Sequence, residues 1–239
     1  MSTRIFALAL TLALTAAAGD LQPSMAQKDT ILLQNDFSQP GPLPPGVWQP
    51  RQHTRWAAAD GLFHGRESSP EFQASQSHHQ GLEPRLMIRN LPDEYIIEYS
   101  FRINSGKYTP IGAFLEFGHH MARVSFLPAG AMLTFGGLKD RVVLDSKPDF
   151  RLEPGRWYHV LGEVKGKEVL VTIEDGPTFY GNHPGIADQK DGFGVCGLRG
   201  GTMDLDNVTV WSVQPALQQS WSGTHSRLAS AAGDPTPKR

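Results

Sequence analysis

Hydrophobic and polar residues alternate along much of this chain. The clearest stretch is 94–104, in which every second residue from Tyr95 to Ile103 is aromatic or aliphatic. Successive side chains of a strand point to opposite faces, so this pattern predicts a strand with one buried face and with Glu98 and Arg102 pointing outward. Similar strand-like runs are 31–33, 56–59, 62–64, 85–88, 111–117, 122–127, 131–135, 157–165, 168–175, 192–198 and 203–211.

Turn-forming residues separate these runs. Asp60-Gly61 and Gly166-Lys167 each stand between two strand-like segments and predict tight hairpins. No stretch keeps a helical period for more than two turns. The 25 Gly and 18 Pro among 239 residues, with only 19% charged residues, also favour short strands and turns over long solvent-facing helices. We therefore predict an all-β sandwich or barrel, formed by one domain over 27–213.

The first 26 residues have the pattern of a secretory signal peptide. Arg4 precedes an apolar stretch over 5–18, and small residues mark two cleavage points, after Ala18 and after Ala26. We expect cleavage after Ala26, with Ala18 as the alternative. An uncleaved anchor is a further alternative, but the apolar stretch is shorter than the roughly 20 residues of a membrane span. The pattern predicts a secreted or periplasmic bacterial protein with no membrane span after cleavage.

Composition excludes several classes of function. The 22 Lys and Arg against 24 Asp and Glu give a net charge of −2 without a basic block, which excludes nucleic acid as a partner. The single cysteine, Cys196, cannot form an internal disulfide or a Cys-based zinc site, and its apolar surroundings predict a buried thiol. Residues 214–239 lack apolar periodicity, and we expect a disordered C-terminal tail there.

Three stretches resemble the concanavalin A-like lectin and glucanase group. They are 56–63 with its Asp60-Gly61 turn, 155–160 (Gly-Arg-Trp-Tyr-His-Val) and 206–211 (Asp-Asn-Val-Thr-Val-Trp). Within that group the chain is most similar to the secreted 3-keto-disaccharide hydrolase family, also called family 16 glycoside hydrolase-like, through 94–102, 111–115, 118–124 and 183–194. The resemblance implies a two-sheet antiparallel jelly-roll sandwich whose concave outer face meets carbohydrate.

The resemblance does not imply one activity. The laminarinase-type signature Glu-x-Asp-x-x-Glu, which sets its carboxylates on one strand face, is absent from this sequence. The leading hypothesis is therefore an exported carbohydrate-binding domain. The alternative is a hydrolase of 3-keto-glycosides, or a related glycosidase or lyase. A structural cell-surface module without a ligand is the second alternative.

Candidate site residues come from the polar strand faces and from one turn. If the strands that contain them are neighbours, Glu98, Arg102, Glu116 and Arg123 form one patch that could hold sugar hydroxyls; a solvated face with cross-strand ion pairs is the alternative. His119 and His120 lie in the turn before Arg123, where histidine suits a general base or a metal ligand; a rim position with ordinary hydrogen bonding is the alternative. For an enzyme, the expected catalytic residues are Glu116, His119, His120 and Arg123.

Two further pairs complete the predicted site. Trp48 and Trp56 lie in or beside the first long loop and could stack on sugar rings, although packing in the core is the alternative. Asp36 and Asp206 lie on the presumed first and last strands, which are expected to pair, so their carboxylates could hold a structural calcium ion; turn and edge polarity is the alternative. No other cofactor is indicated.

Overall fold

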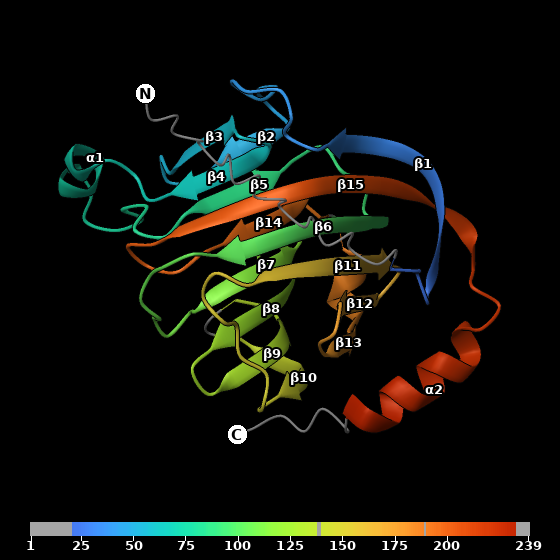
Figure 1. Cartoon of the computed structure of the whole chain (residues 1–239). Coiled ribbons are helices and arrows are strands. Elements are labelled where there is room, and N and C mark those ends of the chain that lie inside the picture. The colour runs from blue at the N-terminus through green and yellow to red at the C-terminus, as the bar shows by residue number, and fades with distance from the viewer. Residues whose placement is uncertain (1–20, 138–139, 189, 233–239) are drawn as a thin grey trace, which may run out of the picture.

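Two antiparallel β-sheets lie face to face in the computed structural model, which describes residues 21–137, 140–188 and 190–232 (Figure 1). Sheet A has the strand order β13-β12-β11-β6-β15-β4-β3, with β1 also paired to β15, and sheet B has the order β10-β9-β8-β7-β14-β5-β2. The predicted all-β sandwich is confirmed. The strands are β1 (Ala26–Asn35), β2 (Trp48–Pro50), β3 (Arg55–Ala59), β4 (Leu62–Arg66), β5 (Arg85–Ile88), β6 (Tyr95–Ile103), β7 (Ala113–Phe117), β8 (Ala122–Leu127), β9 (Gly130–Phe135), β10 (Val142–Lys147), β11 (Trp157–Lys165), β12 (Glu168–Ile173), β13 (Thr178–Asn182), β14 (Phe193–Cys196) and β15 (Thr202–Leu217).

Both predicted hairpins are present. Asp60 and Gly61 have φ angles of 53° and 75° between β3 and β4, which is the left-handed backbone of the tight turn that matches strand twist. Gly166 has φ 55° between β11 and β12. These turns hold β3 on β4 and β11 on β12 by local pairing.

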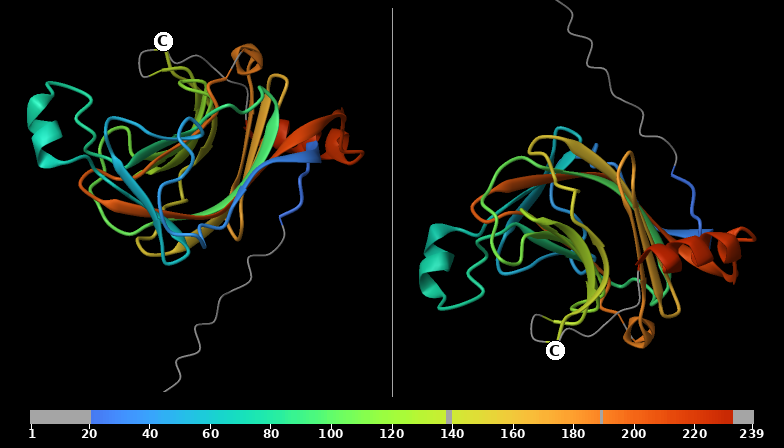
Figure 2. Two further views of the ribbon diagram at one scale, coloured as in Figure 1. Left: turned by 90° about the horizontal axis from the view of Figure 1, so that it is seen from above. Right: turned by 90° about the horizontal axis from the view of Figure 1, so that it is seen from below.

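The core fills the space between the inner faces of the two sheets, which are curved (Figure 2). Strand β6 lies in the middle of sheet A, and its alternating residues from Tyr95 to Ile103 are all at most 2% exposed. Sheet B contributes alternating residues of β7 and β8 to the same core. The aromatic and aliphatic side chains on these three inner faces are Tyr95, Ile97, Tyr99, Phe101, Ile103, Ala113, Leu115, Phe117, Ala122, Val124 and Phe126.

Strand β15 joins distant parts of the chain. It pairs with β6 along one side, and on the other side first with β4 through Thr202–Leu205 and then with β1 up to Leu217. The register shifts between Asp206 and Thr209, where Asn207 has φ 51°. This bulge separates the two pairing partners. The expected pairing of the first and last strands is confirmed.

The C-terminal segment corrects the sequence analysis. Residues 214–217 continue β15, and α2 (Trp221–Ala232) follows, so the prediction of a disordered tail is wrong up to residue 232; residues 233–239 lie outside the described part of the chain. Trp221 is 4% exposed and packs with Met25, Leu170 and Tyr180. The partly buried Leu228 packs on the same cluster, and His225 contacts the rings of Tyr180 and Trp221, so one short face of α2 holds the helix on the domain.

Two short helical segments complete the fold. These are α1 (Pro70–Ser75), capped by the Ser69 side chain, and a 3₁₀ turn over Pro184–Ala187. The helices α1 and α2 lie at opposite sides of the sandwich (Figure 1). No helix in the described ranges is long and apolar enough to cross a membrane.

Cys196 is buried, as predicted. Its side chain is 1% exposed and forms no disulfide. Burial raises the pKa of the thiol to about 12, which keeps it protonated at neutral pH.

A buried carboxylate holds the segment that precedes β1. Glu163 on β11 is 1% exposed, and its carboxylate accepts hydrogen bonds from the backbone N–H groups of Ser24, Met25 and Ala26 at 3.0, 2.8 and 2.7 Å. Met25 and Ala26 are themselves fully buried. The folded domain therefore begins before residue 27, and cleavage after Ala26 would remove three hydrogen-bond donors from a buried charge.

This contact is kept in a chain that begins after Ala18 and is lost in a chain that begins after Ala26. We expect a chain that starts at Gly19 to be more stable than one that starts at Gln27, by about 3–5 kcal/mol in urea unfolding, because the shorter chain leaves Glu163 without its donors. Glu163→Gln in the shorter chain is the matched control and recovers part of the loss, since a neutral amide costs less to bury. Equal stability of the two chains would contradict this role of Glu163.

Candidate functional site

The outer face of sheet B contains a hollow of about 860 Å³. It crosses β2, β5, β14, β7 and β8, which pair in register there, and loop residues 51–54 and His79 form part of its wall. One cross-strand row lies along its floor. In strand order this row is Gln49, Met87, Gly194, Glu116 and Arg123.

Gly194 lets the Met87 side chain lie over the middle strand of this row. A Cβ at this position would lie 2.6 Å from Met87 Sδ, closer than packed atoms approach, and 3.6 Å from the Glu116 carboxylate. The sulfur of Met87 therefore occupies the space that a side chain at 194 would need, and a larger residue there would displace it.

An ion pair between neighbouring strands occupies the floor. Glu116 and Arg123 are directly opposite each other on β7 and β8, and they are 3% and 7% exposed. Arg123 donates from Nε to Glu116 Oε1 at 3.1 Å and makes a second, shorter bond from Nη2. The guanidinium also lies 4.1 Å above the ring of Phe114. Packing on a ring and hydrogen bonding to a carboxylate fix the position of the guanidinium.

Glu116 is ionised over the whole neutral and mildly acidic range. Burial alone would raise its pKa, but the His119 ring and the charge and hydrogen bonds of Arg123 outweigh burial and lower the pKa to about 2. The backbone N–H of His120 adds a hydrogen bond of 2.9 Å. A carboxylate held in this way accepts hydrogen bonds and is unsuited to donating a proton.

The histidine turn lies at the rim of the hollow. Gly118 and His120 have φ angles of 82° and 60°, and Met121 N donates to Gly118 O, which closes a tight turn between β7 and β8. The rings of His119 and His120 are 3.9 Å apart at their centres, with side chains 43% and 54% exposed. Partial burial and the neighbouring His119 lower the pKa of His120, so its ring is neutral at neutral pH.

The turn also brings together three groups that could ligate a metal. Donor atoms of Glu116, His119 and His120 lie within 4.8 Å of one another, and this is the one such group found among the described residues. However, Glu116 Oε1 is already shared with Arg123, and Arg123 Nη2 is 3.3 Å from His120 Nδ1. The guanidinium charge opposes a divalent cation at Oε1, so only Oε2, which lies 3.6 Å from His119 Nδ1, is suited to ligate a metal.

The four residues predicted for catalysis therefore converge in one hollow, but the larger predicted patch is wrong. Glu98 and Arg102 lie on β6 in sheet A, whereas Glu116 and Arg123 lie on sheet B, so the core separates the two pairs. Strand neighbours cannot be read from sequence order in a fold whose consecutive strands change sheets. Glu98 pairs with Lys28 and His159, which agrees with the alternative interpretation, a sheet face with cross-strand ion pairs.

The two tryptophans also differ from the prediction. Trp48 is 5% exposed and packs edge-on against Phe37 and Phe63, so its prediction as a carbohydrate-binding residue is wrong, and core packing is its role. Trp56 is half-buried, with its ring 5.1 Å from Phe63 and its Nε1 donating to the carbonyl of Arg85. It does not line the hollow of sheet B, and its role toward sugar stays a prediction.

The predicted calcium residues lie near each other where β1 ends. Burial raises the pKa of Asp206, and the charge of Asp36 raises it further. Both carboxylates have local partners, since Asp36 accepts from the backbone and hydroxyl of Ser38 and Asp206 accepts from Asn207. No third acidic or histidine ligand joins them among the described residues, and calcium here stays a prediction.

Sequence reasoning missed part of the hollow. Arg85 and Phe114 lie at outward-facing positions of two strands that the sequence predicts. The alternation of inward and outward residues along these strands is therefore the signal that could have placed both side chains on the outer face. His53 and His79 lie in loops, and the pattern of the sequence gives no indication that these loops meet. Their positions follow only from the pairing of β2 with β5.

Comparison with solved structures establishes the fold. SCLam, a non-specific endo-beta-1,3(4)-glucanase from family GH16, matches with a TM-score of 0.51 and 10% identity over 80% of this chain and 97% of that one. LamA of Zobellia galactanivorans, as a variant in complex with laminaritriose and laminaritetraose, matches with a TM-score of 0.51 and 10% identity over 78% and 100%. Its catalytic domain LamAcat matches with a TM-score of 0.50 and 10% identity over 77% and 98%.

These likenesses confirm the concanavalin A-like jelly roll. No family model matches the chain, and no curated protein matches it. The narrower similarity to the 3-keto-disaccharide hydrolase family therefore stays a prediction.

The ion pair on the floor predicts a specific acid response. Because the pKa of Glu116 is lowered from 4.5 to about 2, its stabilising contribution is complete above pH 4.5 and is lost as the pH falls toward 2. We expect the stability advantage of the native chain over Glu116→Gln to shrink by roughly 3 kcal/mol across this interval. Urea unfolding of both proteins at several pH values measures it. An advantage that stays constant down to the lowest pH would contradict the lowered pKa.

Proposed function

We propose that this chain is an exported carbohydrate-binding domain that holds a sugar chain in the hollow on the outer face of sheet B. The observation that carries the proposal is the fixed Glu116–Arg123 pair on the floor of this hollow. The volume of about 860 Å³ lies in the range of small-ligand sites and suits an oligosaccharide of a few rings.

The lining offers both kinds of hydrogen-bonding partner that sugar hydroxyls need. The carboxylate of Glu116 accepts hydrogen bonds, the guanidinium groups of Arg85 and Arg123 donate them, and the side chain of Gln49 does both. The ring of Phe114, only 5% exposed, supports the guanidinium groups from below. Binding therefore needs little rearrangement, because the polar groups are already held in place.

The lining argues against two-carboxylate glycoside hydrolysis. Glu116 is the only acidic residue among the described residues that line the hollow, and it stays ionised. Glycosidases of this type need a second carboxyl group as the partner in acid–base or nucleophilic catalysis. Binding is accordingly the first candidate.

The neutral His120 supports a second candidate, cleavage of 3-keto-glycosides. A ketone at C3 makes the C2–H bond acidic, so one base can remove that proton without a second carboxylate. The electron pair of the resulting enolate then expels the aglycone by breaking the C1–O bond, and the released oxygen takes a proton from water. His120 can accept a proton at neutral pH, and Arg85 and Arg123 are placed to stabilise negative charge in the same hollow.

For the binding proposal we predict that His120→Asn weakens sugar binding about tenfold, which is the loss of one or two hydrogen bonds at the rim. Asparagine tolerates the left-handed backbone of this position, so the fold is kept. Glycan-array screening identifies the sugar, and isothermal titration calorimetry measures the affinity.

The matched control is His78→Asn, since His78 is also exposed but does not line the hollow. We expect its affinity and its thermal midpoint to equal those of the native chain. Equal affinities of all three proteins, or no binding to any glycan on the array, would remove the proposed site.

For the enzyme candidate we predict release of the aglycone from 3-keto-glucosides but not from the parent glucosides, because only the ketone acidifies the C–H bond. His120→Asn should reduce the rate at least a hundredfold, the usual contribution of a general base. Product release is followed by chromatography, with and without a chelator. Measurable glycan binding with no turnover of either substrate would leave the binding proposal and eliminate this one.

A further inference from the structure

A second hollow lies on the outer face of sheet A, on the other side of the core from the first. Its volume is about 650 Å³, and it crosses β3, β4, β15 and β6. Its polar lining consists mainly of cations around one carboxylate. The residues that matter here are Arg55, Trp56, His64, Arg66, Arg102 and Asp204.

One buried carboxylate organises the floor of this hollow. Asp204 on β15 is 2% exposed and is directly opposite His64 on β4 and Arg102 on β6. Its Oδ1 lies 2.7 Å from His64 Nδ1, and its Oδ2 accepts from Arg102 Nε and Nη2 at 3.1 and 2.6 Å and from Asn104 at 2.9 Å. Asp204 therefore fixes three polar side chains and uses both of its oxygens to do so.

The groups held by Asp204 differ in how many partners they have. His64 Nε2 lies 3.1 Å from the carbonyl oxygen of Ala59, so both ring nitrogens lie next to acceptors. Nη1 of Arg102 has no hydrogen-bond partner within the described ranges, and its guanidinium lies 4.6 Å from the Trp157 ring centre. His64, Asp204 and Arg102 form one cross-strand row. Trp157, which is 37% exposed, is the cross-strand partner of Arg102 and extends this row beyond the hollow.

Two further arginines face each other in the next cross-strand row, since Arg66 is two residues from His64 on β4. Arg55 and Arg66 are direct cross-strand partners on β3 and β4, and like charges in this position destabilise a sheet. Arg55 donates a hydrogen bond to the backbone carbonyl of Glu67, and its charge contributes to the lowered pKa of Glu71. No carboxylate forms an ion pair with Arg55 or Arg66 among the described residues. An anion between them would relieve this repulsion.

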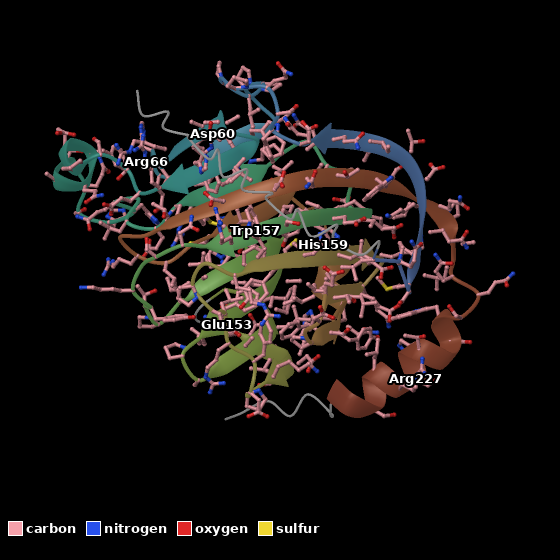
Figure 3. The ribbon with its side chains drawn as sticks, in the orientation of Figure 1. Asp60, Arg66, Glu153, Trp157, His159 and Arg227 are labelled. Carbon is pink, nitrogen blue, oxygen red and sulfur yellow. The ribbon has the colours of Figure 1, made fainter. Side chains whose placement is uncertain are left out.

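The charge in this hollow differs from that of the molecule. Three arginines and one carboxylate line it, whereas the whole chain has a net charge of −2. Figure 3 labels Arg66 on β4 and Trp157 on β11. Trp157 is at the end of the row that His64, Asp204 and Arg102 form, and Arg66 lies in the next row. Cations in two neighbouring rows beside a half-exposed aromatic ring are suited to an extended ligand that carries an oxyanion.

We infer that the outer face of sheet A is a second glycan site, one that binds the carboxylate or sulfate group of an acidic sugar between Arg55, Arg66 and Arg102. The oxyanion accepts hydrogen bonds from these guanidinium groups, and another sugar ring of the same glycan covers Trp157. This site is independent of the hollow on sheet B, since no residue lines both.

The test uses trigalacturonic acid and its methyl ester, which has the same rings without the charges. Isothermal titration calorimetry should show binding of the acid and not of the ester, and Arg66→Gln should weaken the binding of the acid about tenfold, the loss of a charge-assisted hydrogen bond. Trp157 emission should change on binding, and Trp157→Phe should remove that change. Arg227→Gln is the matched control, because Arg227 is an exposed arginine on α2, away from this row (Figure 3).

The outcomes separate this site from the one on sheet B. If His120→Asn weakens the binding of trigalacturonic acid and Arg66→Gln does not, the acid binds in the other hollow and the inference is overturned. Equal binding of acid and ester, or equal effects of Arg66→Gln and Arg227→Gln, also overturns it. Sodium sulfate that displaces the acid at an equal concentration would mean a site for small free anions and would overturn the glycan assignment.

Discussion

Side chains of a β-strand alternate between two faces, and in a two-sheet sandwich one of these faces must be apolar. Because Tyr95 through Ile103 fill the inner face of β6, and Leu115 and Val124 fill those of β7 and β8, every polar residue of these strands is on an outer face. The molecule therefore has two polar surfaces with a continuous core between them. Any chemistry on one surface is physically separated from chemistry on the other.

Three nearly buried carboxylates organise those outer surfaces. Glu116 fixes Arg123 on sheet B, Asp204 fixes His64 and Arg102 on sheet A, and Glu163 fixes the backbone that precedes β1. Each is at most 3% exposed and has several donors, which is the condition under which a buried charge is tolerated. Glu116 and Asp204 each hold basic side chains in place at the bottom of a hollow, whereas Glu163 holds the backbone near the start of β1.

The sequence pattern predicts the local features well and the long-range ones poorly. Alternation and turn residues identify the hairpins and the two faces of β6, because these depend on neighbours in the chain. The pattern does not predict β2, β10 and β13, each of which lies at an edge of its sheet. Edge strands have one paired side and mixed burial, so their hydrophobic signal is weak.

The site illustrates the same limit. Glu116, His119, His120 and Arg123 were found together because one hairpin contains them all. The mistaken link to Glu98 and Arg102 arose because alternation gives the face of a strand but not the sheet to which it belongs. Trp48 differs from its prediction for a related reason, since a short edge strand turns it into the core. The pattern does not predict α2, because this helix contacts the domain through few side chains, namely Trp221, His225 and the partly buried Leu228.

The position of β15 has a consequence for how the chain reaches this structure. This strand begins at Thr202, yet it lies between β4 and β6 and also supports β1 (Figure 1). A chain that is still being synthesised, or still being threaded through a channel, lacks the strand that lies between β4 and β6, and both of these strands have an unpaired edge. Sheet A can close only when nearly the whole chain is available, so its completion depends on a pairing between residues far apart in the sequence and comes late.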